Sequence, residues 1–362
     1  MENLEPSQTN PTVRKVFWFM LFVATAIVVA SFLVPAWLTY PFRKQSNLDI
    51  EISFFLRRWS PLFTPMLFAL VLTATTLLWR QSKAWYLKVL LMLALVLSLS
   101  STWLVRQNYY EWAFSPLHFP EYTKIEKVDF LSDKDLVIAV EIAGESVAYP
   151  VRQIFYHHII EDNVGGVPIV VTYCGLCRSG LVWESTLDGR KLSFNLSGIK
   201  NQNFIMSDVE TGSWWQQATG KALQGPLKGS ALKPVLSDII SFGIWKQERP
   251  TGRVLVPEKK SKDMGSYEND AAEQAILALP MPTFPQQPLQ PRELVAGINI
   301  YGLSKAYPVK AVEVKNLIFD ILGTTPIVIV IDKDRKSVRS YEAIIDGKQL
   351  ELSVKSDSTV FQ

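Results

Sequence analysis

The chain has 362 residues, of which 48% are hydrophobic, and it carries a formal net charge of only +3 at pH 7. No block of lysine and arginine with interleaved aromatic residues stands out, which argues against nucleic acid as a partner. The whole chain contains two cysteines and three histidines, too few cysteines for a disulfide-stapled scaffold. Any metal or redox site must therefore be built from very few side chains.

The first third of the chain predicts three membrane-spanning helices. Uncharged apolar runs cover 16–38, 61–79 and 89–105, and Trp85 and Tyr86 precede the last run like interfacial anchors. At about 1.5 Å per residue, such runs approach the roughly 30 Å thickness of the hydrocarbon layer. We expect a tail at 1–15, a transmembrane region at 16–105 with helices at 16–38, 61–79 and 85–105, and a soluble domain at 106–362. The lipid bilayer is thus a predicted partner.

The distribution of charge does not orient these helices. With three spans, the tail and the second loop share one side of the membrane and carry five lysines and arginines, and the opposite side also carries five. The first apolar run is longer than the usual core of a cleaved signal peptide, so we interpret it as a retained anchor.

The soluble part contains an internal repeat. The segment Ala-Tyr-Pro-Val at 148–151 recurs at 306–309, an offset of 158 residues, and the same offset aligns Asp-Gly at 188–189 with Asp-Gly at 346–347. The register holds without a gap over about fifty residues, which predicts two copies of one unit. We place them at about 136–196 and 294–354, separated by a Gly- and Trp-rich stretch at 207–229 and a proline-rich connector at 264–291.

The first copy predicts the order strand, strand, helix and three further strands. Strands are expected at 136–142, 146–149 and 169–173, and a helix from Pro150 to about Asn163. Two more strands, 181–185 and 191–196, are expected to pair across Asp188-Gly189. Because helices and strands do not alternate regularly, we predict an α+β domain with a mostly antiparallel sheet.

Both cysteines belong to the first copy alone. At the offset of 158, Cys174 aligns with Asp332, Cys177 with Arg335, and His158 with Asn316. Residues that both copies keep serve the shared backbone. The three residues that only the first copy has are therefore candidates for a functional site.

The spacing of Cys174 and Cys177 allows three interpretations. The first is a thiol/disulfide redox couple that needs no cofactor, with Arg178 favouring the thiolate. The residues that follow resemble a strand, whereas thioredoxin-type motifs open a helix. The second interpretation is a metal site, for zinc or copper, formed by both sulfurs and His158 with an open fourth position. The third is an inert pair of thiols or a local disulfide.

Three motifs resemble the bacterial family catalogued as domain of unknown function 3179. They are Tyr-Cys-Gly-Leu-Cys at 173–177, the segment from Asp208 to Gln217, and Gly-Pro-x-x-Gly-x-x-Leu at 225–232, within a match of about 130–310. Gly175 replaces a proline of the family, which should loosen the turn. His158 and Asp162 match the family's His and Asp, but its glutamate is missing here.

The resemblance implies a reactive redox position at the cysteine motif and, because many relatives look secreted, a domain outside the cytoplasm. We expect a membrane-anchored, extracytoplasmic thiol/disulfide redox domain that acts on an unknown protein or thiol partner. If Cys177 is replaced by serine, Cys174 should then accumulate as a mixed disulfide. The expected catalytic residues are Cys174, Cys177 and His158, and the expected binding residues are Arg178, Asp208, Trp215 and Gln217. The alternative is a module that binds a metal ion or a partner without turnover.

Overall fold

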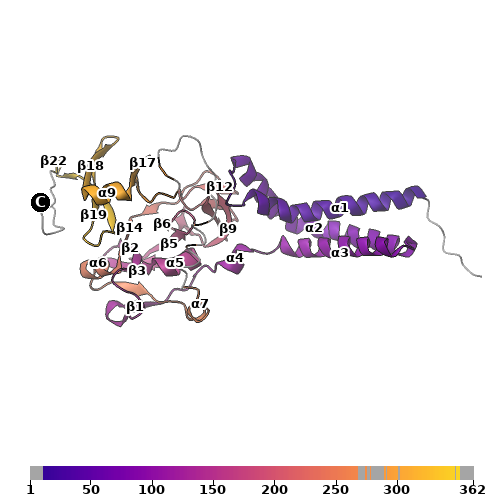
Figure 1. Cartoon of the computed structure of the whole chain (residues 1–362), viewed down its shortest axis with the longest axis horizontal. Coiled ribbons are helices and arrows are strands. Elements are labelled where there is room, and N and C mark those ends of the chain that lie inside the picture. The colour runs from indigo at the N-terminus through magenta and orange to yellow at the C-terminus, as the bar shows by residue number, and fades with distance from the viewer. Residues whose placement is uncertain are drawn as a thin grey trace, which may run out of the picture.

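The computed structural model describes residues 11–267, 274, 278, 289–290, 292–300, 302–346 and 348–350. Three long helices form a stem, and a body made of small sheets lies at one end of it (Figure 1). The first ten residues of the tail, most of the proline-rich connector predicted at 264–291, and residues 351–354 of the predicted second copy lie outside the described residues.

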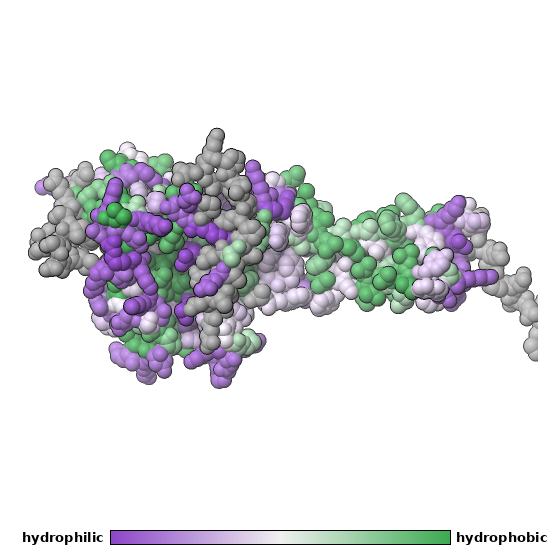
Figure 2. Space-filling model, viewed as in Figure 1, coloured by the Kyte–Doolittle hydropathy of each residue, from purple (hydrophilic) through white to green (hydrophobic). Residues whose placement is uncertain are grey.

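The stem consists of α1 (Pro11–Leu38), α2 (Asn47–Gln81) and α3 (Trp85–Leu104). All three helices are long and apolar enough to cross a membrane, as the sequence predicted. Leu21, Val71 and Leu91 pack together inside the stem. Large apolar side chains such as Phe22 and Met66 remain exposed, and Figure 2 shows an apolar band around the helices. Such a surface is suited to contact with lipid tails.

The second helix is longer than predicted, because it begins at Asn47 and not at 61. Ser46 and Asp49 form a capping box at its start: the Ser46 hydroxyl accepts from the Asp49 N–H, and the Asp49 carboxylate accepts from the Ser46 N–H. The first part of α2, residues 47–60, contains charged side chains, so it was not included in the uncharged apolar run from which the helix was predicted. It reaches the body, where Ile50 and Trp214 share a small core.

The body is mostly antiparallel, as predicted, and β15–β3 is the one parallel pairing among the described strands. One sheet has the strand order β1-β15-β3-β2-β14 and two others the orders β12-β11-β10-β9 and β13-β6-β5-β4. Their strands are β1 (Tyr122–Lys124), β2 (Leu136–Ile142), β3 (Glu145–Pro150), β4 (Ile159–Val164), β5 (Val167–Cys174), β6 (Ser179–Glu184), β9 (Phe194–Lys200), β10 (Asn203–Asp208), β11 (Trp214–Gln216), β12 (Ala222–Gln224), β13 (Pro234–Val235), β14 (Ser237–Ser241) and β15 (Arg253–Leu255). Short helical segments accompany them: α4 (Tyr110–Ala113) before β1, η1 (Ile125–Lys127), α5 (Val151–His157) and α6 (Phe242–Glu248) between strands, and α7 (Lys259–Asp263) after β15.

Two local predictions in the first copy were wrong. The helix that was expected to reach Asn163 ends at His157, because His158 adopts a positive φ of 62° and the chain continues as β4. The apolar spacing that suggested a longer helix belongs instead to a buried strand that pairs with β5. The second error concerns the hairpin at Asp188-Gly189. Only the short strands β7 (Thr186–Leu187) and β8 (Arg190–Lys191) pair there, whereas β6 pairs with β5 and β13, and β9 pairs with β10.

The C-terminal segment repeats the element order of the first copy. It contains β16 (Val295–Ile300), β17 (Leu303–Pro308), α9 (Val309–Lys315), β18 (Leu317–Leu322), β19 (Thr325–Ile331), β20 (Val338–Glu342), β21 (Ile344–Ile345) and β22 (Lys348–Gln349). Strand partners correspond at the offset of 158: Val137 pairs with Pro150, and Val295 pairs with Pro308. The ladder between β5 and β6 has the same register as the ladder between β19 and β20.

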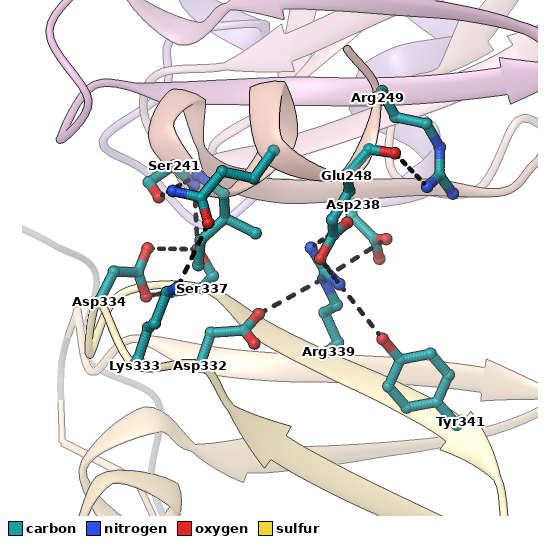
Figure 3. Close-up of polar contacts among 12 residues, drawn as sticks. Asp238, Ser241, Glu248, Arg249, Asp332, Lys333, Asp334, Ser337, Arg339 and Tyr341 are labelled. Carbon is teal, nitrogen blue, oxygen red and sulfur yellow. Dashed lines mark hydrogen bonds and ion pairs between the residues drawn. The ribbon is translucent and has the colours of Figure 1, made fainter. Parts of the chain in front are cut away.

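The C-terminal segment lies at the end of the body that is farthest from the stem (Figure 1). It has a small core of its own, which includes Ile298, Val312 and Ile329. Polar contacts join it to β14 and α6 (Figure 3): Arg339 forms an ion pair with Glu248, and the backbone N–H of Ser241 donates to the hydroxyl of Ser337 at 2.9 Å.

Candidate functional site

The cysteine pair lies in the loop between β5 and β6. Cys174 ends β5 and pairs with Ser179, the first residue of β6, so the strand ladder closes the loop. The two cysteines come within 2.9 Å of each other and are not bonded. Cys174 is buried, whereas Cys177 is exposed. The loop therefore presents one thiol to solvent with the other directly behind it.

A glycine permits the close packing of this loop. A Cβ atom at Gly175 would lie 2.7 Å from Cε2 of Phe155, a ring on α5, so any larger residue requires that ring to move. Arg178 adopts a positive φ of 50°, which turns the chain toward β6. Gly175 thus allows the Phe155 ring to pack directly against the cysteine loop.

Cys174 is held as a neutral thiol. Its Sγ lies 3.3 Å from the backbone carbonyl oxygen of Gln202, and the side chain belongs to a core cluster with Phe204 and Trp215. Burial raises the pKa of Cys174 well above its ordinary value, because the thiolate would lose its hydration. Asn201 and Gln202 form the turn between β9 and β10, and both adopt positive φ.

Cys177 has the opposite electrostatic environment. A hydrogen bond from Cys174 lowers the pKa of Cys177 to about 6, and further hydrogen bonds from Ser179 and Asn203 act in the same direction against the effect of burial. The Ser179 hydroxyl lies 3.0 Å from the Cys177 sulfur, and the Asn203 amide donates to that sulfur at 3.4 Å. Arg178, which the sequence suggested as the activating group, is not one of the groups that lower the pKa most.

Gln217 fixes the side chains that contact Cys177. It is fully buried, and its Oε1 accepts from the Asn203 amide at 2.6 Å and lies 3.4 Å from the Ser179 hydroxyl. Its Nε2 donates to the Thr172 hydroxyl at 3.0 Å. The sequence placed Gln217 at the site but missed Asn203 and Ser179. Ser179 aligns with a serine in the second copy, which suggested a backbone role, and Asn203 belongs to no motif.

Trp215 and Asp208 are buried and organise the chain next to the site. Trp215 is fully buried in the core cluster that includes Cys174, and its indole N–H donates to Asp208 at 2.8 Å. The Asp208 carboxylate also accepts from the backbone N–H groups of Thr211 and Ser213. These contacts give the two residues a role in shaping the segment 208–217, and their part in binding stays a prediction.

His158 is a packed ring in the body. The rings of Phe114, Phe155 and Phe204 surround it, with centroids at 4.2, 6.4 and 5.6 Å. Burial lowers the pKa of His158 to about 4, so the ring is neutral at physiological pH. Among the hydrogen bonds of the described residues, its ring contacts the carbonyl of Tyr156 and neither cysteine.

The position of His158 also carries a backbone duty that sequence comparison of the two copies missed. Its φ is 62°, and Asn316, the matching residue of the C-terminal segment, has a φ of 61°. Asparagine and histidine both tolerate this conformation better than most residues. The single-copy histidine is therefore not free of structural constraint.

The described residues provide no group of three or more His, Cys, Asp and Glu side chains that could hold a metal ion. The other two histidines are engaged elsewhere: His118 pairs with Glu161, and His157 contacts the Ser115 carbonyl and the Tyr267 hydroxyl. The metal alternative thus gains no support from the arrangement of the two thiols.

Three apolar helices that carry a mostly antiparallel β body with adjacent cysteines define a class of helix-anchored β-domain protein. The chain belongs to the family described as protein of unknown function (DUF3179), whose sequence model matches residues 114–361. That match is wider than the 130–310 suggested by the motifs and takes in the C-terminal segment. No curated protein and no solved structure matches this chain.

Proposed function

We propose that this protein exchanges thiols and disulfides with a partner outside the cytoplasm, through Cys177 as the attacking thiolate and Cys174 as the resolving thiol. The observation that carries the proposal is the pairing of an exposed sulfur whose pKa is lowered to about 6 with a buried thiol whose pKa is raised. The thiolate is the attacking species in disulfide exchange, and it must be accessible. Cys177 meets both conditions.

The exchange proceeds in two balanced steps. The Cys177 thiolate attacks one sulfur of a partner disulfide, forms a mixed disulfide, and releases the partner's other sulfur as a thiolate. Cys174 then loses its proton to that leaving thiolate and attacks Cys177, so that the Cys174–Cys177 disulfide forms and the second partner thiolate leaves. The partner gains two electrons and the cysteine pair loses them. The reverse sequence oxidises a partner dithiol.

The hydrogen bonds to Cys177 stabilise its thiolate, and so the reduced form of the pair. Stabilisation of the reduced form makes a cysteine pair more oxidising. In the oxidising direction a partner thiolate attacks Cys177 of the Cys174–Cys177 disulfide, and Cys177 leaves as a thiolate when the second partner sulfur closes the partner's disulfide. This direction suits a compartment outside the cytoplasm, where disulfides persist. A reporter that is active only in the cytoplasm, fused after the last residue, should therefore be inactive, and its activity would contradict this placement.

We infer that 136–196 and 294–354 are two copies of one unit, of which only the first performs exchange. The shared element order and the shared ladder registers at the offset of 158 support this inference. In the second copy, Asp332 and Arg335 occupy the positions of the two cysteines.

The roles of the two cysteines are tested on the full chain in detergent with an aromatic disulfide that releases a coloured thiolate. The wild-type chain should release two equivalents and end as an internal disulfide. Cys174→Ser should release one equivalent and retain an adduct on Cys177, detected by mass spectrometry. Cys177→Ser should not react below pH 8, because Cys174 is buried and protonated.

An adduct that accumulates on Cys174 in the Cys177→Ser variant would reverse the two roles, as the sequence had suggested. A wild-type chain that reacts at neither sulfur would remove the redox proposal altogether.

A further inference from the structure

A second candidate site lies where the stem meets the body. A cavity of about 370 Å³ opens between α2, the residues after α3, and strands β9 to β11. Among the described residues that line it, Arg57, Arg58 and Arg106 carry positive charge and none carries negative charge. The cavity is separate from the cysteine loop, whose residues do not line it.

Among the described residues, the hydrogen bonds of the three arginines go to backbone carbonyl groups. Arg57 and Arg58 each donate to a backbone carbonyl of the body, those of Ser197 and Thr211, both at 3.3 Å. Arg106 donates to backbone carbonyls of α2 and α3. Within the described part of the chain, no ion pair joins these guanidinium groups to a carboxylate. A carbonyl oxygen does not neutralise a cation, so the cavity holds a concentrated positive charge that lacks a protein counterion.

Neighbouring residues hold these cations in place. The Arg57 guanidinium lies 4.9 Å from the centroid of the Tyr109 ring, within the range of a cation–π interaction. Gly212 leaves room for Arg58, since a Cβ atom there would lie 3.1 Å from its Nη1. Guanidinium groups present paired N–H donors that match the geometry of a phosphate.

The cavity lies at the ends of two apolar helices. In α2 the uncharged residues begin directly after Arg58, and in α3 the apolar stretch ends at Leu104, shortly before Arg106. This is the depth at which lipid headgroups meet the hydrocarbon layer. A mostly apolar hollow of about 380 Å³, lined by Leu99, Ser100, Trp103 and Leu104, lies on α3 just before the cavity residues along the chain.

We propose that the arginine cavity binds the phosphate group of an anionic phospholipid, with an acyl chain along the apolar hollow of α3. Free inorganic phosphate offers the same chemical group. The position at the end of the apolar helices favours the lipid, because only a lipid places its phosphate at this depth and an acyl chain beside α3. A lipid bound there would contact both the stem and the β9–β11 strands.

The test is lipid binding to the full chain in detergent, followed by native mass spectrometry. Phosphatidylglycerol should bind more tightly than phosphatidylcholine. In Arg58→Gln/Arg106→Gln, the affinity for phosphatidylglycerol should fall about 25-fold, at about fivefold for each arginine near a charged membrane surface. The control Arg80→Gln/Lys83→Gln removes the same charge at the opposite end of the helices and should leave the affinity unchanged.

Two results would overturn the proposal. If the arginine variant and the control bind phosphatidylglycerol equally, the cavity is not the lipid site. If inorganic phosphate alone binds with the same arginine dependence and phosphatidylglycerol is not preferred over phosphatidylcholine, the site takes free phosphate. Arg58→Lys/Arg106→Lys keeps both charges but loses the paired donors, so it should bind phosphatidylglycerol less tightly than the wild-type chain and more tightly than Arg58→Gln/Arg106→Gln, which separates loss of charge from loss of folding.

Discussion

Cys174 and Asp332 occupy matching positions at the ends of β5 and β19, and Ser179 and Ser337 close the loops that follow them. In the first loop the serine hydroxyl contacts the Cys177 sulfur. In the second, the hydroxyl of Ser337 donates to Asp334 and accepts from the backbone of Ser241. The same backbone ladder thus holds a thiol pair in one place and a docking contact in the other (Figure 3).

The shared strand ladder fixes the backbone of β5–β6 and of β19–β20, whereas the side chains of the loops between these strands differ. At the offset of 158, positions 158 and 177 align with Asn316 and Arg335 of the C-terminal segment, where the arginine donates to the asparagine side chain. These two positions are therefore close enough for a long side chain to join them. In the first copy, His158 packs among phenylalanine rings instead.

The largest effect is expected at His158, whose folded pKa of about 4 lies below its ordinary value of 6.5. The unfolded chain binds a proton at this histidine more readily than the folded chain does. The free energy of unfolding should therefore keep its full value above pH 6.5 and fall by about 3 kcal/mol as the pH drops toward 4. His158→Asn, which suits the positive φ as Asn316 does, should remove this part of the acid sensitivity. Thermal unfolding of the full chain at pH 7 and pH 4.5 measures it. Equal acid sensitivity in both proteins would contradict the assignment.

The next effect concerns the docking of the C-terminal segment through Arg339. Its guanidinium is 10% exposed and makes two hydrogen bonds to Glu248, at 2.9 and 3.0 Å. Arg339→Met should cost about 2 kcal/mol, less than a fully buried pair because Glu248 is partly hydrated. The control Arg249→Met breaks a more exposed pair with Glu141 and should cost under about 0.5 kcal/mol. Equal melting temperatures for the two variants would show that Arg339 does not hold the segment.

A smaller effect is expected for the reactivity of Cys177. Its pH–rate profile for alkylation should have a midpoint near pH 6 in the wild-type chain. Cys174→Ala removes the hydrogen bond that lowers this pKa most, so the midpoint should rise and the rate at pH 6.5 should fall about fivefold. The matched variant Asp332→Ala in the second copy should leave the profile unchanged. An unshifted midpoint in Cys174→Ala would mean that the buried thiol does not tune the exposed one.

The smallest effect separates the two matching serines. Ser179→Ala should raise the pKa of Cys177 and slow alkylation at pH 6.5 about twofold, as one weak hydrogen bond is lost. Ser337→Ala should leave alkylation unchanged and destabilise the chain by about 1 kcal/mol, because it leaves the Ser241 N–H without its acceptor. The opposite pattern would mean that the two loops do not differ as described.

Much of the fold could be predicted because its signals are local. The apolar runs that became α1, α2 and α3 and the hairpin of β2 and β3 follow from hydrophobicity and alternation over short stretches. The end of α5 could not be predicted in this way, because it depends on a positive φ at His158 that the residue type only permits. The start of α2 was missed because its charged first turns are stabilised by contact with the body.

The sequence by itself determined the three apolar helices, the mostly antiparallel body, the family, and the loop that contains Cys174 and Cys177. Only the tertiary structure decided which thiol is exposed, that Asn203 and Gln217 support it, and that His158 and Trp215 are packed in the interior. The physical reason is that pKa and accessibility depend on burial and on hydrogen bonds from strands distant in the chain. Residue type and spacing place two sulfurs near each other, but their environments come from β9 to β11.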